Sequence, residues 1–169
     1  KHADVAEGGK VGFWDVFGNR SILFLTSSYA ALGYFQYLFF YWIEYYFSQI
    51  EVVEPHVARR YTTVITLAMG LGMAAGGWLS DRRPLAWSPT ARRRFVPAVG
   101  MFASGAVFEA GVLSGDSRAT FAAFVASAAL LGACEAAFWT TIVELGGKLG
   151  GTAAGLMNTG GNAGGSLSP

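Results

Sequence analysis

Long apolar runs, separated by short polar connections, make up most of this chain. Five runs cover residues 21–47, 61–80, 95–113, 119–143 and 151–169. A helix needs about 20 mainly apolar residues to cross a bilayer, because each residue rises about 1.5 Å through a hydrocarbon layer roughly 30 Å thick. An amphipathic helix of a soluble protein would show a polar residue every three or four positions, and these runs do not. The pattern predicts an all-α membrane protein.

The composition agrees with this prediction. Hydrophobic residues make up 53% of the chain, charged residues make up 14%, and the net charge is +1. This balance is typical of a membrane protein whose partner is the lipid bilayer, and it gives no reason to expect nucleic acid. Cys134 is the single cysteine and is expected to be a packing residue. No phosphate-binding loop, metal-ligand cluster or Ser/His/Asp grouping is visible, so we expect no enzyme activity, no cofactor and no metal.

The distribution of Lys and Arg predicts the orientation. If the connection from residue 81 to residue 94 is cytoplasmic, nine basic residues lie on that side and three on the other. The first set is Lys1, Lys10, Arg20, Arg82, Arg83, Arg92, Arg93, Arg94 and Lys148; the second is Arg59, Arg60 and Arg118. By the positive-inside rule the amino end is cytoplasmic, in a multi-pass protein of an inner or plasma membrane. Residues 1–20 then form a cytoplasmic segment before a transmembrane domain at 21–169.

The connection after the second run carries a recognisable motif. Within "GGWLSDRRPLAWSPTARRR", Gly77, Asp81 and Arg82 precede a second basic cluster. A basic loop at a cytoplasmic membrane exit would show much of the same composition. The order nevertheless resembles the loop motif of the major facilitator superfamily, with Pro84 and the insertion "LAWSP" as departures from it. The resemblance implies that these three residues form a cytoplasmic gate latch.

A second, more specific motif lies near the carboxyl end. Residues 135–165 read "EAAFWTTIVELGGKLGGTAAGLMNTGGNAGG", with an aromatic pair, an acidic residue at the end of the run, and glycines and asparagines at helical spacing. This stretch resembles the tenth and eleventh spans of the anion:cation symporter branch of the same superfamily. The positions concerned are Phe138, Trp139, Glu144, Gly155, Asn158, Gly161, Asn162 and Gly165. Residues 33–47 also resemble the seventh span of sugar-acid carriers.

These resemblances imply part of a twelve-span carrier. The chain would supply spans seven to ten and most of eleven, as a truncated carboxy-terminal half that lacks its six-span amino-terminal partner. Its first residue, Lys rather than Met, also leads us to expect an excerpt of a longer protein. The implied function is secondary active transport of a small organic anion, a sugar acid or other carboxylate, with protons or sodium ions by alternating access. The alternative is a membrane-embedded enzyme or scaffold subunit without transport.

Candidate substrate-binding residues come from the cost of polar groups in lipid. Asn158 and Asn162 lie four residues apart and so share one helical face, where they would face a wet cavity or bond a neighbouring helix. Trp139 could stack on a sugar ring or anchor the helix at the interface. Thr140 is a further candidate, although its hydroxyl could bond its own helix instead.

Tyrosines mark one face of the first run. At helical spacing, one stripe contains Tyr34, Tyr37, Tyr41 and Glu44. Its tyrosines could line a sugar-sized pocket. The last two positions of the stripe could instead belong to an interfacial belt. Gln36 is expected to point about 100° away from either of its neighbours in the sequence on the helical wheel. If it is buried, its amide would need hydrogen-bond partners of its own.

Two carboxyl groups lie inside the apolar runs. Glu109 and Glu135 would each cost roughly 3 kcal/mol or more in mid-membrane unless they meet water, a partner or a proton. A group that alternately takes up a cation and meets an anionic substrate could couple their movements. Both are candidate coupling-ion residues, and Glu135 is preferred because it lies one turn from Trp139.

Overall fold

The computed structural model describes residues 13–81 and 89–168 and is all-α, as the sequence predicts. For residues 13, 80, 81 and 89–96 it describes the backbone alone. The helices are α1 (Phe13–Gly18), α2 (Arg20–Tyr37), α3 (Ile43–Tyr45), α4 (Pro55–Asp81), α5 (Pro89–Leu113), α6 (Ser117–Gly146) and α7 (Gly150–Ser166). Two π-helical turns, Leu38–Trp42 and Tyr46–Ile50, join α2 to α3 and extend α3, and a 3₁₀ turn, Gly147–Leu149, joins α6 to α7.

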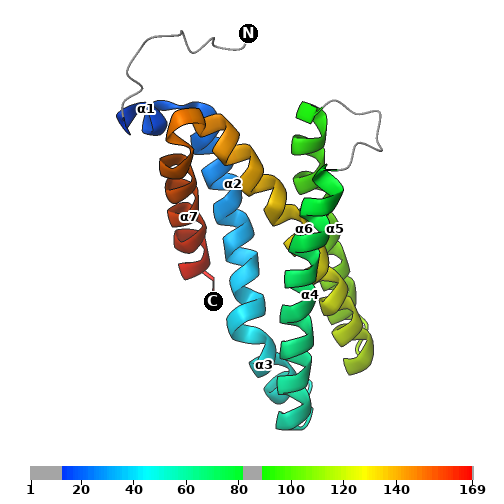
Figure 1. Ribbon diagram of the computed structural model, residues 1–169. Coiled ribbons are helices and arrows are strands. Elements are labelled where there is room, and N and C mark those ends of the chain that lie inside the picture. Colours follow the sequence, from blue (N-terminus) through cyan, green and yellow to red (C-terminus); the bar gives the residue numbers. More distant parts are fainter. Residues whose placement is uncertain (1–12, 82–88, 169) are drawn as a thin grey trace.

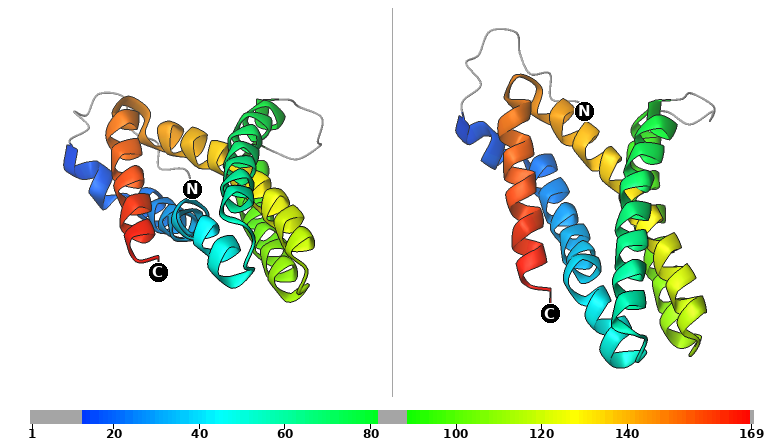
Figure 2. Two further views of the ribbon diagram at one scale, coloured as in Figure 1. Left: turned by 90° about the horizontal axis from the view of Figure 1, so that it is seen from below. Right: turned by 60° about the horizontal axis from the view of Figure 1, so that its bottom comes forward.

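Five long helices form the structure, with successive helices antiparallel (Figure 1). The helices α2 and α7 pack on each other, whereas α4 and α5 each pack on α6, which runs obliquely and contacts all four of the other long helices (Figures 1 and 2). The helix α6 therefore joins α4 and α5 to the pair formed by α2 and α7. The chain from α2 to α4 turns back at the end opposite α1, where α3 meets α4.

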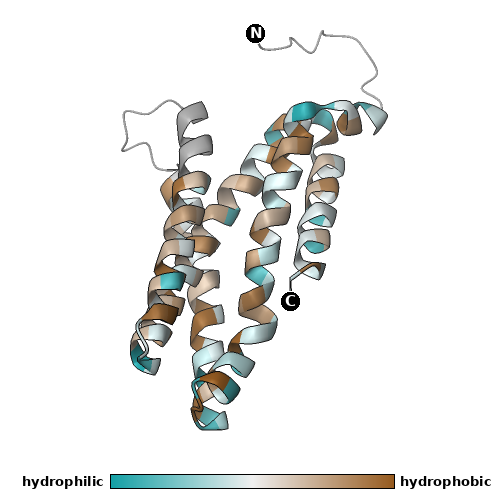
Figure 3. Cartoon of the chain, turned by 180° about the vertical axis from the view of Figure 1, so that it is seen from behind, coloured by the Kyte–Doolittle hydropathy of each residue, from teal (hydrophilic) through white to brown (hydrophobic). Residues whose placement is uncertain are grey.

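Three helical segments of the described residues are long and apolar enough to cross a membrane. They are Arg20–Ile50, Pro55–Leu79 and Ser117–Ser166, the last of which contains both α6 and α7. The apolar part of α5, Pro97–Leu113, is shorter. Hydrophobic residues occupy much of the length of these helices, and hydrophilic residues gather at the ends of the structure (Figure 3). The helices begin and end a few residues outside most of the predicted runs, because polar residues continue the helical backbone beyond the apolar part.

Glycines allow four of the helices to touch through their backbones, α4 with α6 and α7 with α2. On α4, a Cβ at Gly72 or Gly76 would collide with the backbone of α6, and on α6 a Cβ at Gly132 would collide with Met69 O. On α7, a Cβ at Gly164 would collide with Ala30 O of α2. In lipid, where helix association relies on close packing, such contacts hold helices together.

Aromatic rings fill the space between helices at the end away from α1. Phe108 of α5 stacks on Phe124 of α6 with ring centroids 4.4 Å apart, and Phe39 of the first π-helical turn lies edge-on to both. Tyr61 of α4 stacks on Phe121 of α6 at 3.9 Å. These rings join four helical segments into one core, within which Phe39 and Phe124 are each 1% exposed.

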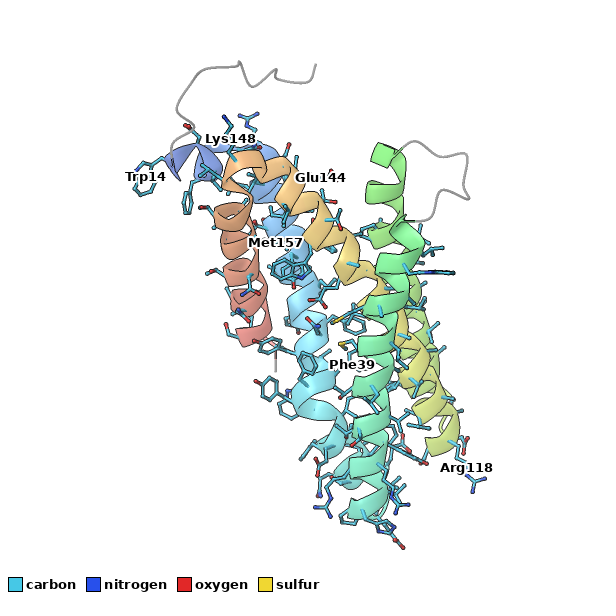
Figure 4. All side chains as sticks on the ribbon, viewed as in Figure 1. Trp14, Phe39, Arg118, Glu144, Lys148 and Met157 are labelled. Atoms are coloured by element: carbon cyan, nitrogen blue, oxygen red, sulfur yellow. The ribbon has the colours of Figure 1, made fainter. Side chains whose placement is uncertain are left out.

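A sharp reversal connects α6 to α7. Gly147 has φ +50°, a left-handed conformation that a residue with a side chain rarely adopts, and its N–H caps the end of α6. Glu144 and Lys148 lie beside this reversal, whereas Arg118 lies at the opposite end of the molecule (Figure 4). The reversal brings α7 back along α2.

Because α7 packs on α2 through glycine, a glycine of α7 that touches α2 and one that does not should respond differently to substitution. Gly164→Ala places a Cβ against Ala30 O, and we expect a loss of about 1–3 kcal/mol in the free energy of unfolding. Gly155→Ala on the same helix meets nothing within 4 Å and should be neutral or stabilising by up to about 1 kcal/mol. Unfolding of the purified proteins in detergent, followed by circular dichroism, measures both. Equal effects would contradict the packing of α7 on α2.

Candidate functional site

A cavity of about 320 Å³ lies between α2, α6 and α7. Its α2 side continues into the first π-helical turn. Its walls are aromatic rings, amides, glycines and one carboxylate. The lining residues are Tyr29, Gly33, Gln36, Tyr37, Phe40, Tyr41, Glu135, Trp139, Asn158, Gly161 and Asn162. Ligand pockets in proteins start at roughly this volume, so the cavity fits a small organic molecule.

The carboxylate of Glu135 is held by three hydrogen-bond donors. Its Oε1 accepts from Tyr29 Oη at 2.9 Å and from Trp139 Nε1 at 3.3 Å, and its Oε2 accepts from Gln36 Nε2 at 3.1 Å. We call these four residues the Glu135 cluster. The donors are neutral, and no Lys, Arg or His among the described residues lines the cavity. An acceptor-only, ionised carboxylate suits this set of donors.

Helical spacing assembles the Glu135 cluster from two helices. Glu135 and Trp139 lie four residues apart on α6 and so share a face, and Tyr29 and Gln36 lie seven apart on α2. The Tyr29 ring packs against Phe138 and, edge-on, against Trp139, with centroids 5.4 and 6.0 Å away. Tyr29 is 5% exposed and Gln36 is 9% exposed, so packing fixes the two donors of α2.

The asparagines of α7 form the opposite wall. Tyr37 Oη donates to Asn162 Oδ1 at 3.0 Å, which ties α2 to α7. Asn158 lines the same cavity, is exposed, and makes no hydrogen bond to another described residue. Its amide therefore has donors and an acceptor available to a bound molecule. The sequence left open whether the asparagines face a cavity or bond a neighbouring helix. Both of them line the cavity, and Asn162 also bonds a neighbouring helix.

Glycines of α7 make room for the tyrosines of α2. A Cβ at Gly161 would lie 2.6 Å from the Tyr29 ring, and one at Gly165 would lie 2.5 Å from the Tyr37 ring. Both rings can approach α7 this closely only because these positions lack side chains. The two glycines thus shape the cavity.

The structure brings most of the sequence-predicted site residues to this cavity. Seven of them line it, namely Gln36, Tyr37, Tyr41, Glu135, Trp139, Asn158 and Asn162. Gln36 and Tyr37 point to different helices, in agreement with the helical wheel, since Gln36 bonds Glu135 of α6 and Tyr37 bonds Asn162 of α7, yet both line the cavity. Adjacent positions can do so because α6 lies on one side of this stretch of α2 and α7 on the other.

Three predicted residues lie elsewhere. Tyr34 is 43% exposed and does not line the cavity. Thr140 is exposed and donates to Ala136 O at 2.9 Å, which is the bond to its own helix that the sequence left open. Glu109 is exposed on α5, outside the cavity.

The gate motif lies away from the cavity and partly outside the described residues. Gly77 is half-buried on α4, where a Cβ would touch Ala136 of α6 at 3.9 Å. Asp81 is the last residue of α4, and the structure describes only its backbone. Arg82 lies outside the described residues. The contacts of the motif thus stay a prediction.

Sequence reasoning missed four lining residues, Tyr29, Gly33, Phe40 and Gly161. Tyr29 and Gly33 lie seven and three residues before Gln36, a helical spacing that would have selected them had Gln36 been taken as the reference position. Phe40 lies in the π-helical turn Leu38–Trp42, where a wider helical turn alters the wheel. Gly161 was noticed only as part of a family motif.

Comparisons with protein-family models, with curated proteins and with solved structures find no match to this chain. The described residues also contain no group of three or more His, Cys, Asp or Glu side chains placed to hold a metal ion.

The asparagine wall predicts a pattern of chemical labelling. In a Cys134→Ala background, Asn158→Cys and Asn162→Cys should react with a water-soluble thiol reagent, because both positions are exposed on the cavity. Ala153→Cys on the same helix is the matched control and should stay unreactive, since Ala153 is 0% exposed. Mass spectrometry of the labelled protein in liposomes measures the extent of reaction. If the two asparagine positions resist labelling in every condition, the cavity is not open to water.

Proposed function

We propose that this chain forms most of the carboxy-terminal half of a multi-pass secondary active transporter of the major facilitator type. It would move a small organic anion, a sugar acid or other carboxylate, with protons or sodium ions. The amino end would be cytoplasmic. Two halves rocking about a central site would expose that site alternately to each side of the membrane. The cavity that contains the Glu135 cluster carries the proposal.

The lining of the cavity suits a hydroxylated organic molecule. Tyrosine and tryptophan rings offer apolar faces that fit the faces of a sugar, while the O–H groups of Tyr29 and Tyr37 and the Trp139 N–H are bonded within the protein. The unbonded amide of Asn158 and the exposed ring of Tyr41 add contacts on the open side. Such a wall can select by shape and by hydroxyl pattern.

The charge in the cavity suits ion coupling. Glu135 lies within the segment Ser117–Ser166, which is apolar enough to cross a membrane, and the described side chains give it no cationic partner. A carboxylate in this position is costly and marks an ion pathway more often than a structural contact. A cation bound there would lower the repulsion felt by an anionic substrate.

The chain supplies only part of an anion site. A carboxylate substrate needs a cation or several strong donors, and the described lining holds no Lys or Arg. The proposed architecture assigns this cation to the amino-terminal half. The cavity would then be completed only when the two halves meet.

Uptake by proteoliposomes tests the proposal on the complete protein that contains this chain. A panel of labelled sugar acids and simpler carboxylates should include a substrate that shows counterflow. Glu135→Gln should lower its uphill uptake by about tenfold to a hundredfold, because a hydrogen bond to a charged group is worth about 1.5–3 kcal/mol.

Glu109→Gln is the matched control, since it removes the same charge from an exposed position outside the cavity. It should keep uptake near the unmodified level. Absence of counterflow for every carboxylate would refute the transport proposal and favour a scaffold subunit. Equal losses in the two variants would remove Glu135 from the coupling site.

A further inference from the structure

The donors around Glu135 discriminate between the two coupling ions. Resting on the transport function proposed above, we infer that Glu135 binds a proton and not a sodium ion, and that the side chain of Gln36 turns over to accommodate it.

A sodium ion would find too few oxygen atoms. Hard cations are held by several oxygen ligands, and sodium sites in carriers use backbone carbonyls of unwound helices. The three groups bonded to Glu135 present two nitrogens and one oxygen, that of Tyr29. Turning the amide of Gln36 would add one further oxygen. The helix α6 is continuous from Ser117 to Gly146, and α2 stays α-helical through Gln36, so their carbonyls are bonded within the helices.

The asparagine oxygens of the cavity belong to the wall that α7 forms, and not to the groups bonded to Glu135. Of the two, Asn162 Oδ1 already accepts from Tyr37, which leaves that of Asn158. The π-helical turn begins at Leu38, after both α2 residues that contact the carboxylate. The surroundings of Glu135 are therefore poor in acceptors and rich in donors.

A proton can be accommodated by one rotation. When Oε2 is protonated, its O–H becomes a donor and conflicts with the Gln36 N–H that now points at it. Turning the amide of Gln36 presents its oxygen to that O–H, while Oε1 continues to accept from Tyr29 and Trp139. The rotation gives up a 3.4 Å contact from Gln36 Nε2 to Met69 Sδ of α4, and a thioether is a weak acceptor. Each of the four residues of the cluster thus keeps at least one hydrogen bond within the cluster in both states.

Glu135 is the one carboxylate among the described residues that line the cavity. From α2 the titratable group in contact is Tyr29, and Tyr37 and Tyr41 lie further along the wall. From α4 the cluster meets Met69, and from α7 the lining residues are Asn158, Gly161 and Asn162, none of which titrates. On α5, the described Pro97 and Gly100 lie against Cys134, the neighbour of Glu135. Among the described residues that line the cavity, a pH-dependent change of charge would thus be assigned to Glu135.

Trp139 provides a direct readout because its indole N–H bonds the carboxylate. The complete protein is titrated with acid in sodium-free choline buffer, and the Trp139 fluorescence is taken as the difference from Trp139→Phe. It should change with pH, and adding sodium chloride in place of choline chloride at fixed pH should leave it unchanged. Glu135→Gln should lose the pH response, because its amide mimics the protonated acid, whereas Glu109→Gln should keep it.

Transport measurements separate failure of this inference from failure of the function. Substrate uptake should be accompanied by proton uptake, measured with a pH-sensitive dye inside the liposomes, and should not require sodium. Carboxylate uptake that needs sodium and carries no proton would overturn the inference and leave the transport function standing. A pH response at Trp139 without uptake of any carboxylate would refute the function and leave the proton site. A pH response that persists in Glu135→Gln, or none in the unmodified protein, overturns the inference.

Discussion

A carboxylate inside an apolar helix bundle has to be solvated by protein groups, and this constraint shapes the centre of the molecule. Glu135 satisfies it with donors from two helices, Tyr29 and Gln36 on α2 and Trp139 on its own helix. These bonds require the face of α2 that carries Tyr29 to meet the face of α6 that carries Phe138. The relative rotation of α2 and α6 is thereby fixed by polar contacts as well as by packing.

The close approach of α7 depends on residues that have no side chain. Gly161 and Gly165 lie against the rings of Tyr29 and Tyr37, and Gly164 lies against the backbone of α2. A helix with larger residues at these positions would stand further away. Asn158 and Asn162 would then no longer face the tyrosines across a small cavity. The same glycines that hold the helices together thus set the volume and the polarity of the site.

Much of the fold could be predicted from the sequence because lipid simplifies the pattern. A run such as residues 119–143 needs no knowledge of its partners to be recognised as a helix, and small residues four apart, such as Gly72 and Gly76, identify a packing face. The pairs Gly160 with Gly164 and Gly161 with Gly165, which are also four residues apart, face α2, whereas Gly151 and Gly155 meet no neighbouring atom within 4 Å.

The site was predicted less completely because its members come from three helices whose mutual rotation is a tertiary property. Residue spacing placed Glu135 beside Trp139 and Asn158 beside Asn162. It could not show which face of α2 meets them, so Tyr34 was selected and Tyr29 was missed. The π-helical turn at Leu38–Trp42 adds to the difficulty, since a regular wheel no longer applies beyond Tyr37.

Under the proposed function, the negative charge of Glu135 could couple the movement of a proton to that of an organic anion. An ionised Glu135 and an anionic substrate repel each other, and two like charges 4 Å apart cost about 4 kcal/mol at an effective dielectric constant of about 20. A bound proton removes this cost and leaves a cavity lined by neutral donors and rings. The empty, ionised site instead keeps all three bonds of the Glu135 cluster, which hold α2 against α6. Under the proposed function, protonation would therefore precede binding of the anion, and loss of the proton would favour its release. Coupling of this type needs no contact between the two ligands, because the same carboxylate responds to both.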